Sequence, residues 1–542
     1  MRGNRNFVIL AGILLLAAAV RLWGIDYGLP CTYCRPDEDR LIATALRLSL
    51  RDPHPHYFIW PGLFFYLTRG VLETAALIHR LLESGPAVTP LRLYLADPTG
   101  FHLVLRYIFC GFGVATVYFL YRLGRRLFSP AAGLLASFFL ALTFLHVRDS
   151  HFAMLDIPAA LLAVVFFLPA ERICERGRWS DYLWSGLLLG LASATKYYAV
   201  LLAVPLITAH LSRGGRGKRS GRWRLTAALV LSAAIFLAGS PYTLLDAGSF
   251  ARQIKDEILA PQFVSGFHLL PGLQTPRGWL YHIVFSFRYG MGWPLEVLAL
   301  VGVGLAVLRA IRGRIPERLL LSFILPFYLA LSFQKSCFIR YTTLLLPFLC
   351  LLAAVLLVSL RSRGKCPAVL LALLSASIML EPALRIIGLD QLLSRPDTRN
   401  LAGDWMEGNI PLTSAVIYSQ PFIFGRPDGF FRYPNRISAP QGLGAAEMRS
   451  LLDLDLPGTK YAVIHESPLA YSSPDPEITR LLAGEGELVY RIDAFQLYRA
   501  RVVFDPFDAF YVPLAGFREA AFPGPDIRIY GFRKAGIHFF SN

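Results

Sequence analysis

The segment at residues 35–40, which reads Arg-Pro-Asp-Glu-Asp-Arg, places three carboxylates in a row near the amino terminus. Proline suits the first turn of a helix and carboxylates favour the positive end of the helix dipole, so the segment predicts a helix start. Residues 40–51 then carry a basic face and an apolar face, which predicts an amphipathic helix on a membrane surface. Asp37 and Glu38 could accept a proton or hold a metal ion. The alternative is a capped interfacial helix without chemistry.

A second charged cluster lies at residues 146–156, which read His-Val-Arg-Asp-Ser-His-Phe-Ala-Met-Leu-Asp. Imidazole and carboxylate groups are common metal ligands, so His146 and His151 could join Asp37 or Glu38 in a metal site. A divalent metal is thus an open alternative. Asp156 could instead cap its own helix, although a carboxylate at the head of a membrane span is more often functional.

Three single cations, Arg106, Lys196 and Arg340, lie within or beside apolar runs. A charge in the apolar part of a membrane is costly unless it serves a site. Arg106 and Arg340 could instead extend their charged ends to the membrane interface. Among the seven cysteines only Cys31 and Cys34 form a close pair. A local disulfide or two free thiols is favoured over half of a zinc site, because no partner pair accompanies them.

The elements that must position these residues are membrane helices. Hydrophobic residues make up 55% of the chain and charged residues 17%, whereas a soluble domain carries roughly 25% charge. The apolar residues come in blocks of about 15 to 23, the length of a bilayer span. A formal charge of +17 would suggest nucleic acid in a soluble protein, but here the basic residues cluster in short segments between apolar blocks. This is the positive-inside pattern, and no nucleic-acid partner is expected.

A polytopic helical membrane protein with about eleven spans is therefore predicted. Residues 61–82 are also apolar but contain Arg69, Glu73 and Arg80. Counting them as a span would invert every later basic loop, so they are interpreted as an interfacial or re-entrant helix. The predicted spans are 7–22, 103–123, 131–145, 155–170, 183–194, 199–211, 225–238, 295–308, 319–332, 342–360 and 368–380.

After about residue 380 the sequence takes on the texture of a soluble domain. Short runs at 414–418, 461–465 and 488–492 predict strands, and Asp397 opens a predicted helix through Met406. We predict a membrane domain over 1–385, with outer interfacial helices at 36–82, and a soluble α/β domain over 390–542. The odd number of spans places that domain outside the cytoplasm, in a multi-pass protein of the inner or plasma membrane.

In their order, these motifs resemble the phospholipid-carrier-dependent glycosyltransferases. That family includes the protein O-mannosyltransferases and the lipid A aminoarabinose transferases, and it has the C-type glycosyltransferase fold. The resemblance begins with Asp37-Glu38, an aromatic and proline segment at 57–63, and Arg106 at the opening of the second span. It continues through 146–156, 190–196, 240–242, Arg340-Tyr341 with Pro347, and 397–399.

The resemblance implies transfer of one sugar from a polyprenyl-phosphate donor to a lipid, glycan or protein acceptor hydroxyl on the outer membrane face, with inversion. Membrane lipids are the remaining partners. A carboxylate must take the proton of the hydroxyl, and cations must stabilise the departing phosphate. The resemblance implies that Asp37 is the base, assisted by Glu38, and that the donor phosphate is bound by Arg106, Lys196 and Arg340. The implied substrate-binding residues are Asp156, His151 and Tyr341, and the candidate metal ligands are Glu38, His151 and Asp156.

The sequence also departs from the pattern of that family. Aminoarabinose transferases carry an acid and a lysine before the proline matched by Pro61, whereas this chain has Ile59 and Trp60, which argues against their donor and their kind of metal site. The main alternative is a transporter or flippase of a lipid-linked sugar, a class that tends to show paired halves. No such internal symmetry is visible. A structural subunit with an outer binding domain is a third alternative, for which so many spans are excessive.

Overall fold

A computed structural model describes residues 2–532 except for 83–87, 214–217, 267–272, 276, 363–366, 419–432, 440–442, 470–474 and 496–500. The chain forms two compact units. Unit 1 comprises Met1–Leu22, Leu41–Pro90 and Val104–Ile387. Unit 2 comprises Trp23–Arg40, Leu91–Leu103 and Gly388–Asn542, so the acidic segment at 35–40 belongs to the same unit as the carboxyl-terminal domain.

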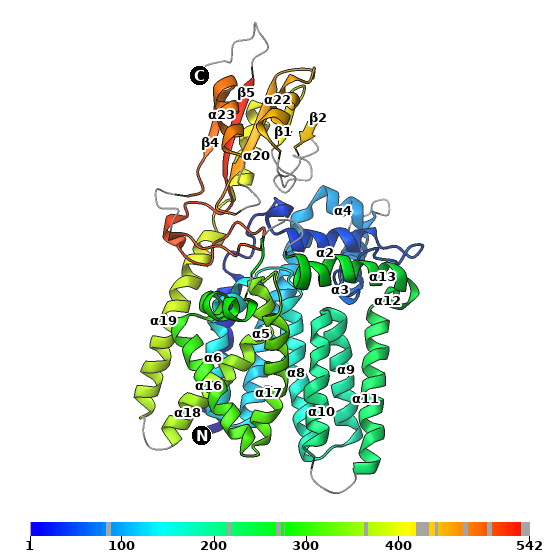
Figure 1. Ribbon diagram of the computed structural model, residues 1–542, viewed down its shortest axis with the longest axis vertical. Coiled ribbons are helices and arrows are strands. Elements are labelled where there is room, and N and C mark those ends of the chain that lie inside the picture. Colours follow the sequence, from blue (N-terminus) through cyan, green and yellow to red (C-terminus); the bar gives the residue numbers. More distant parts are fainter. Residues whose placement is uncertain are drawn as a thin grey trace. The chain divides into compact units, whose positions relative to one another are not determined.

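Unit 1 is built from helices, many of which run roughly parallel or antiparallel to one another (Figure 1). Close packing is visible where α5 meets α6: a Cβ added to Gly124 would lie 2.7 Å from Cα of Gly133. Small residues allow such backbone approach in membrane helices. The main helices involved are α1 (Arg2–Leu22), α3 (Leu63–Leu82), α5 (Pro98–Leu127), α6 (Pro130–Ala141), α7 (Phe144–Ser150), α8 (Asp156–Glu175), α9 (Trp179–Thr195), α10 (Ala203–Leu211), α11 (Lys218–Gly239), α16 (Trp293–Ile311), α17 (Ile315–Ser332), α18 (Leu346–Ser362) and α19 (Ala368–Leu393).

Shorter elements connect these helices. Several of the helices that they connect carry their own start signals: at the start of α6, for example, Ser129 accepts a hydrogen bond from the Ala132 N–H, and Pro130 is the first helical residue. The connecting elements are α2 (Pro36–Arg47), α4 (Pro90–Ala96), α12 (Tyr242–Leu245), α13 (Ala247–Gln253), α14 (Gly278–Tyr281), α15 (Arg288–Met291), the 3-10 helices Thr32–Cys34, Tyr197–Leu202 and Ile339–Thr342, and the π-helices Ile254–Ser265 and His282–Phe287.

Seven helices in the described residues are long and apolar enough to cross a membrane, and the bent pair α6 and α7 adds an eighth. Two shorter apolar helices lie at Tyr197–Leu211 and Leu346–Arg361. These features mark a membrane protein. All the predicted spans fall mainly on helical backbone, but the span count stays a prediction. The predicted interfacial segment forms α3, which is not among the helices that pass this test.

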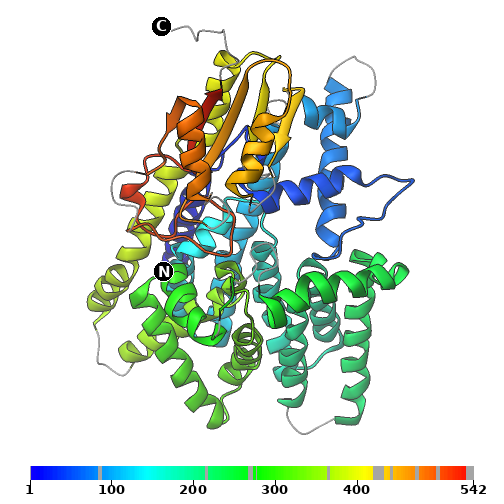
Figure 2. The same ribbon diagram turned by 45° about the horizontal axis from the view of Figure 1, so that its top comes forward.

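Unit 2 contains a five-stranded mixed sheet in the order β2-β1-β3-β5-β4, with β1 parallel to β2 and β3, and β5 antiparallel to β3 and β4 (Figure 2). The strands at 414–418, 461–465 and 488–492 that the sequence predicts coincide with β1, β3 and β4, and the predicted helix coincides with α20. The bounds are β1 (Ala415–Tyr418), β2 (Asn435–Ser438), β3 (Lys460–Glu466), β4 (Glu487–Ile492), β5 (Asp526–Phe532), α20 (Thr398–Asn409), α22 (Ala445–Asp453), α23 (Pro476–Glu485) and a 3-10 turn at Phe517–Glu519.

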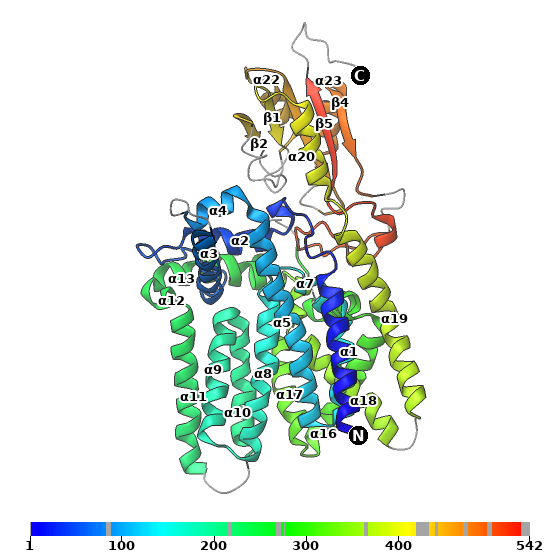
Figure 3. The same cartoon turned by 180° about the vertical axis from the view of Figure 1, so that it is seen from behind.

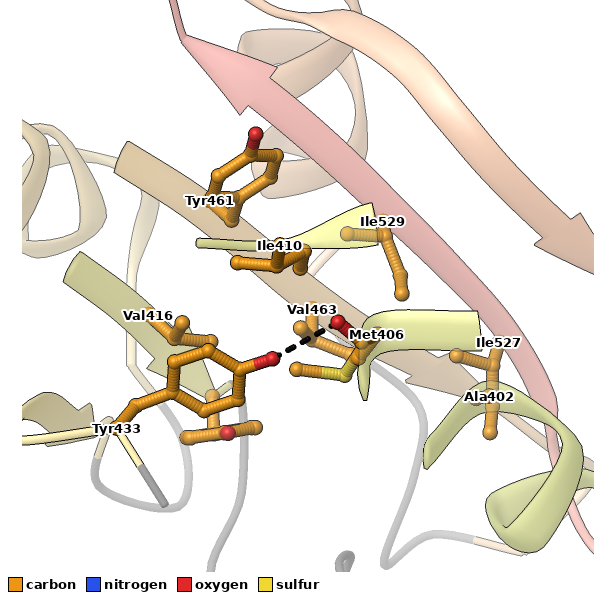
Figure 4. Close-up of a cluster of buried hydrophobic side chains, with 10 residues drawn as sticks. Ala402, Met406, Ile410, Val416, Tyr433, Tyr461, Val463, Ile527 and Ile529 are labelled. Carbon is orange, nitrogen blue, oxygen red and sulfur yellow. Dashed lines mark hydrogen bonds between the residues drawn. The ribbon is translucent and has the colours of Figure 1, made fainter. Parts of the chain in front are cut away.

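Successive residues of a strand point to opposite sides of the sheet, and here apolar side chains lie on both sides. Helices cover both faces and bury these side chains. On one face, α20 packs its Ala402 and Met406 on Val416 and Val463, as Figure 4 shows. There the Tyr433 hydroxyl donates to the Met406 carbonyl at 2.9 Å. The opposite face packs against α22 and α23 through the adjacent strand residues. Two apolar layers therefore stabilise the sheet.

The loop after α1 is fixed within unit 2 by buried polar contacts. The Tyr27 hydroxyl donates to Asp397 at 3.0 Å, and the Asn400 amide donates to the Gly28 carbonyl at 2.9 Å. Asp397 also caps α20 and binds the Arg399 guanidinium. The motif at 397–399 thus orients the segment that leads to the acids of α2.

Candidate active site

The acids at the start of α2 have unequal environments. Asp37 is half-buried, whereas Glu38 has 0% of its surface exposed. Nδ1 of His102 lies 3.5 Å from Oε2 of Glu38, and the Tyr94 hydroxyl lies 3.3 Å from His102 Nε2. All of these residues belong to unit 2. Glu38, Asp39, Tyr94 and His102 are called here the acid–histidine cluster.

Burial sets the protonation behaviour of this cluster. It raises the pKa of Asp39, and the nearby charge of His102 only partly counters the effect. Burial and then the charge of Asp39 raise the pKa of Tyr94, so the phenol stays protonated. The acids of this cluster are therefore withdrawn from water, and their neighbour Asp37, outside the cluster, is half-buried.

His102 was not among the residues that the sequence singled out. It lies one helical turn before Arg106 on α5, and that spacing places the two side chains on one face of the helix. The i, i+4 spacing of a histidine and an arginine was the available signal. Its partner Tyr94 lies on α4, whose position no local pattern predicts.

A second cluster in unit 1 brings together several predicted donor and substrate residues. Lys196 ends α9, and its Nζ lies 3.1 Å from Oδ2 of Asp156 at the start of α8. The Tyr198 hydroxyl donates to the other oxygen of Asp156. Asp156 is fully buried and Lys196 is 9% exposed, so the ion pair is largely withdrawn from solvent.

Aromatic rings link Arg340 and Tyr341 to Tyr198, the tyrosine that binds Asp156. The Tyr198 and Tyr341 rings are 6.4 Å apart, and the Gln262 amide donates to the Tyr341 hydroxyl at 3.5 Å. The Arg340 guanidinium lies 4.2 Å from the Phe338 ring centroid and 6.0 Å from that of Tyr341. Asp156, Lys196, Tyr198, Arg340 and Tyr341 are called here the lysine–aspartate cluster.

Arg106 and His151 are also buried in unit 1. The Arg106 guanidinium lies 5.3 Å from the ring centroid of Phe152, the residue after His151. His151 Nδ1 lies 2.9 Å from the Val147 carbonyl oxygen. The convergence of Arg106 with Lys196 and Arg340 on one phosphate stays a prediction.

The motif at 146–156 is held by partners that the sequence did not indicate. Arg21, at the end of α1, lies with its Nη2 3.0 Å from His146 Nδ1 and donates to the carbonyl of Ala141. Arg148 pairs with Asp149 at 2.9 Å, and Thr343 donates to Asp149 at 3.3 Å. Much of this motif therefore makes buried polar contacts that hold the helices of unit 1 together.

The described residues can be searched for side chains that are grouped closely enough to bind a metal ion. No group of three or more His, Cys, Asp or Glu side chains there could hold a metal ion. The candidate ligands Glu38, His151 and Asp156 are divided between the two units. Cys31 and Cys34 are buried free thiols, and burial raises the pKa of Cys34.

The sequence matches a known protein family over part of its length. Residues 91–242 match the profile of the family described as dolichyl-phosphate-mannose-protein mannosyltransferase. The matched stretch contains Arg106, His151, Asp156 and Lys196. No curated protein matches the sequence. The resemblance to the phospholipid-carrier-dependent glycosyltransferases is therefore confirmed over this part of the chain.

Solved structures resemble the chain at low sequence identity. ArnT from Cupriavidus metallidurans in the apo state has 14% identity and a TM-score of 0.53, covering 98% of this chain and 98% of that one. ArnT bound to undecaprenyl phosphate has 14% identity and a TM-score of 0.51, covering 90% and 96%. Oligosaccharyltransferase AglB from Archaeoglobus fulgidus, in complex with an inhibitory peptide and a dolichol-phosphate, has 14% identity and a TM-score of 0.53, covering 90% and 73%. The chain therefore shares the fold of these solved structures, in agreement with the predicted C-type glycosyltransferase fold.

Proposed function

We propose that this protein transfers a single sugar from a polyprenyl-phosphate donor to an acceptor hydroxyl, with inversion at the anomeric carbon. The acceptor oxygen forms the new bond to that carbon while the bond to the polyprenyl phosphate breaks. The hydroxyl proton passes to Asp37, and the polyprenyl phosphate leaves as an anion. Support comes from the family match and from the fold shared with proteins solved with undecaprenyl phosphate or dolichol-phosphate.

One observation carries the donor assignment: the nearly solvent-free pair of Lys196 and Asp156 in a membrane protein. An ion pair in such a place is expensive and usually serves a site. Lys196 and Arg340 both border the tyrosines of the lysine–aspartate cluster. We assign these cations, with Arg106, to the departing phosphate, and we assign Asp156, His151 and Tyr341 to substrate binding.

The base assignment rests on the contrast between neighbouring acids. Asp37 retains access to solvent, whereas Glu38 is enclosed beside His102. A general base must come within hydrogen-bond reach of the proton that it removes. Asp37 therefore suits proton abstraction, and Glu38 suits the positioning of the start of α2.

The proposed membrane topology places residues 390–542 outside the cytoplasm, where a flipped donor is available. Basic segments at the ends of the apolar helices motivate this orientation. A reporter that is active only in the cytoplasm, fused after residue 542, is expected to be inactive. The same reporter fused in the basic segment after α16, near residue 313, is expected to be active. The reverse pattern would contradict the orientation.

A transfer assay tests the function itself. The purified full chain is mixed with polyprenyl phosphates that carry mannose or glucose, together with membrane extract as a source of acceptor. Free polyprenyl phosphate is measured by mass spectrometry. The proposal predicts its release with wild-type protein. A flippase would leave the sugar–phosphate bond intact. Lipid extracts of a deletion strain then identify the natural donor, which is expected to accumulate.

A further inference from the structure

A cavity of about 720 Å³ is lined by residues of α1, α5 and α8. Figure 3 shows these three helices and the amino terminus at one end of α1. All of it belongs to unit 1. One side is apolar and comes chiefly from α1, including Phe7 and Leu14. The other side carries four arginines: Arg122, Arg125, Arg126 and Arg172. The cavity is thus apolar along one wall and cationic along the other.

Two of the arginines are held in place by neighbours. Arg122 Nη1 donates to the Tyr118 hydroxyl at 2.9 Å, and its guanidinium lies 5.9 Å from that ring. Arg126 pairs with Glu171 and, at 3.1 Å, with Glu175. Four arginines against two glutamates leave an excess of positive charge. The arrangement therefore attracts an anion.

The apolar wall indicates what kind of anion. Phe7 is 72% exposed and lies on α1, a helix apolar enough to cross a membrane, so the wall continues onto a lipid-facing surface. A soluble anion would use the arginines and leave the apolar wall uncovered. A phospholipid would use both, because its acyl chains match the wall and its phosphate matches the guanidinium groups. A volume of this size also suits a headgroup with the first part of its chains.

We infer that this cavity binds an anionic diacyl phospholipid of the leaflet that faces the basic loops. Arg122, Arg125 and Arg172 bind the phosphodiester, and the apolar residues of α1 contact the acyl chains. Bound lipid would tie α1 to α5 and α8. The inference stands independently of the sugar transfer proposed above, because none of these residues belongs to the acid–histidine or lysine–aspartate cluster.

The alternative is that these arginines only mark the orientation of the helices and reach into the headgroup region one by one. The two interpretations predict different effects when the arginines are removed. Single interfacial arginines would be interchangeable with other basic residues on the same loops. A built site depends on the arginines that line it.

The experiment uses the purified full chain in neutral detergent and measures binding of phosphatidylglycerol and phosphatidylcholine by native mass spectrometry. The test variant carries Arg122→Gln, Arg125→Gln and Arg172→Gln, which leaves the ion pairs of Arg126 intact. The matched control carries Arg176→Gln, Arg312→Gln and Arg318→Gln, which removes three positive charges from basic segments outside the cavity lining. Undecaprenyl phosphate is added in a competition arm.

We expect wild type and control to prefer phosphatidylglycerol, and the test variant to bind it at least about tenfold more weakly. Equal loss in test variant and control, or no loss in the test variant, would overturn the site. Displacement by equimolar undecaprenyl phosphate would overturn the assignment to a diacyl lipid. If the triple variant does not purify as a single species, Arg122→Gln and Arg172→Gln are measured singly, and unchanged affinity in both overturns the proposal.

Discussion

The acid–histidine cluster of unit 2 and the lysine–aspartate cluster of unit 1 both withdraw carboxylates from water, but they give them different partners. Glu38 faces a histidine, and burial raises the pKa of its neighbour Asp39. Asp156 faces a lysine ammonium and a tyrosine hydroxyl. The enclosed carboxylate of unit 2 thus lies beside an imidazole, whereas that of unit 1 lies beside an ammonium.

This difference separates two chemical tasks. In unit 2, the enclosed Glu38 positions the start of α2, so that its half-buried neighbour Asp37 can reach and take up a proton, as a base must. A cation held by a buried carboxylate is oriented and ready to contact an anion, as a phosphate site requires. The comparison therefore predicts that changes in unit 2 affect the rate of the chemical step, whereas changes in unit 1 affect donor binding.

The strongest test of this separation is Asp37→Asn. Asparagine keeps the shape of the side chain but cannot take a proton, so turnover is expected to fall about 10²- to 10⁴-fold with little change in donor affinity. The measurement compares kcat and donor KM with those of Glu38→Gln. Near-normal turnover of Asp37→Asn with loss in Glu38→Gln would reverse the roles, and activity of both would remove the catalytic interpretation of α2.

A smaller effect is expected for Lys196→Gln. Loss of a charged contact to phosphate typically costs about 1.5 to 3 kcal/mol, so donor KM is expected to rise about 10- to 150-fold. Lys196→Arg keeps the charge and serves as the control. Folding is monitored by gel filtration, because Asp156 loses its buried partner in Lys196→Gln. A fall in kcat at unchanged KM would break the division between the two clusters.

His102→Gln sharpens the comparison within unit 2. His102 contacts Glu38 and Tyr94 rather than substrate, so it is a positioning residue, and a fall of about tenfold in kcat with donor KM unchanged is expected. The pH profile of kcat is also expected to change, because an ionisable neighbour of Asp39 is lost. His56→Gln is the control, since that side chain is 69% exposed. An unchanged pH profile would indicate a purely structural role.

Different parts of the molecule were predictable to different degrees. The apolar spans, the start of α2 and three strands follow from local periodicity, because burial of one face or of a whole segment leaves a regular pattern. Asp156 and Lys196 could be singled out because charges are rare in such segments. Their pairing at 3.1 Å could not, since it depends on how α8 and α9 pack.

Contacts between distant segments were the least predictable. Tyr94 lies on the short helix α4, and His102 lies on α5 before the predicted span begins, so neither falls within a marked motif. The inclusion of residues 23–40 and 91–103 in unit 2 depends on hydrogen bonds such as Asn400 to Gly28, across 372 positions of sequence. No periodic pattern encodes such a contact.

The smallest expected effect concerns stability and pH, and it contrasts two acids whose pKa values shift in opposite directions. Burial raises the folded-state pKa of Asp39 above the ordinary value of 3.8, so the folded chain holds a proton that the unfolded chain releases. Stability therefore falls as pH rises from 3.8 toward that raised pKa. His56 lowers the pKa of Asp52, so stability there falls as pH drops through the lowered pKa. Asparagine removes either dependence because it does not titrate.

Thermal unfolding of the purified chain between pH 3.5 and 7 can resolve these signs. At the acid end of this range, Asp39→Asn is expected to have the same unfolding midpoint as wild type. At neutral pH its midpoint is expected to be about 1–2 °C higher, and the difference is small because one group contributes little in so large a protein. Asp52→Asn, the matched control at a fully exposed site, is expected to match wild type at the acid end and to melt no higher than wild type at neutral pH. Should Asp39→Asn instead lower the midpoint at neutral pH, the carboxylate of Asp39 is stabilised by its neighbours, and the acid–histidine cluster holds its carboxylate as the lysine–aspartate cluster does.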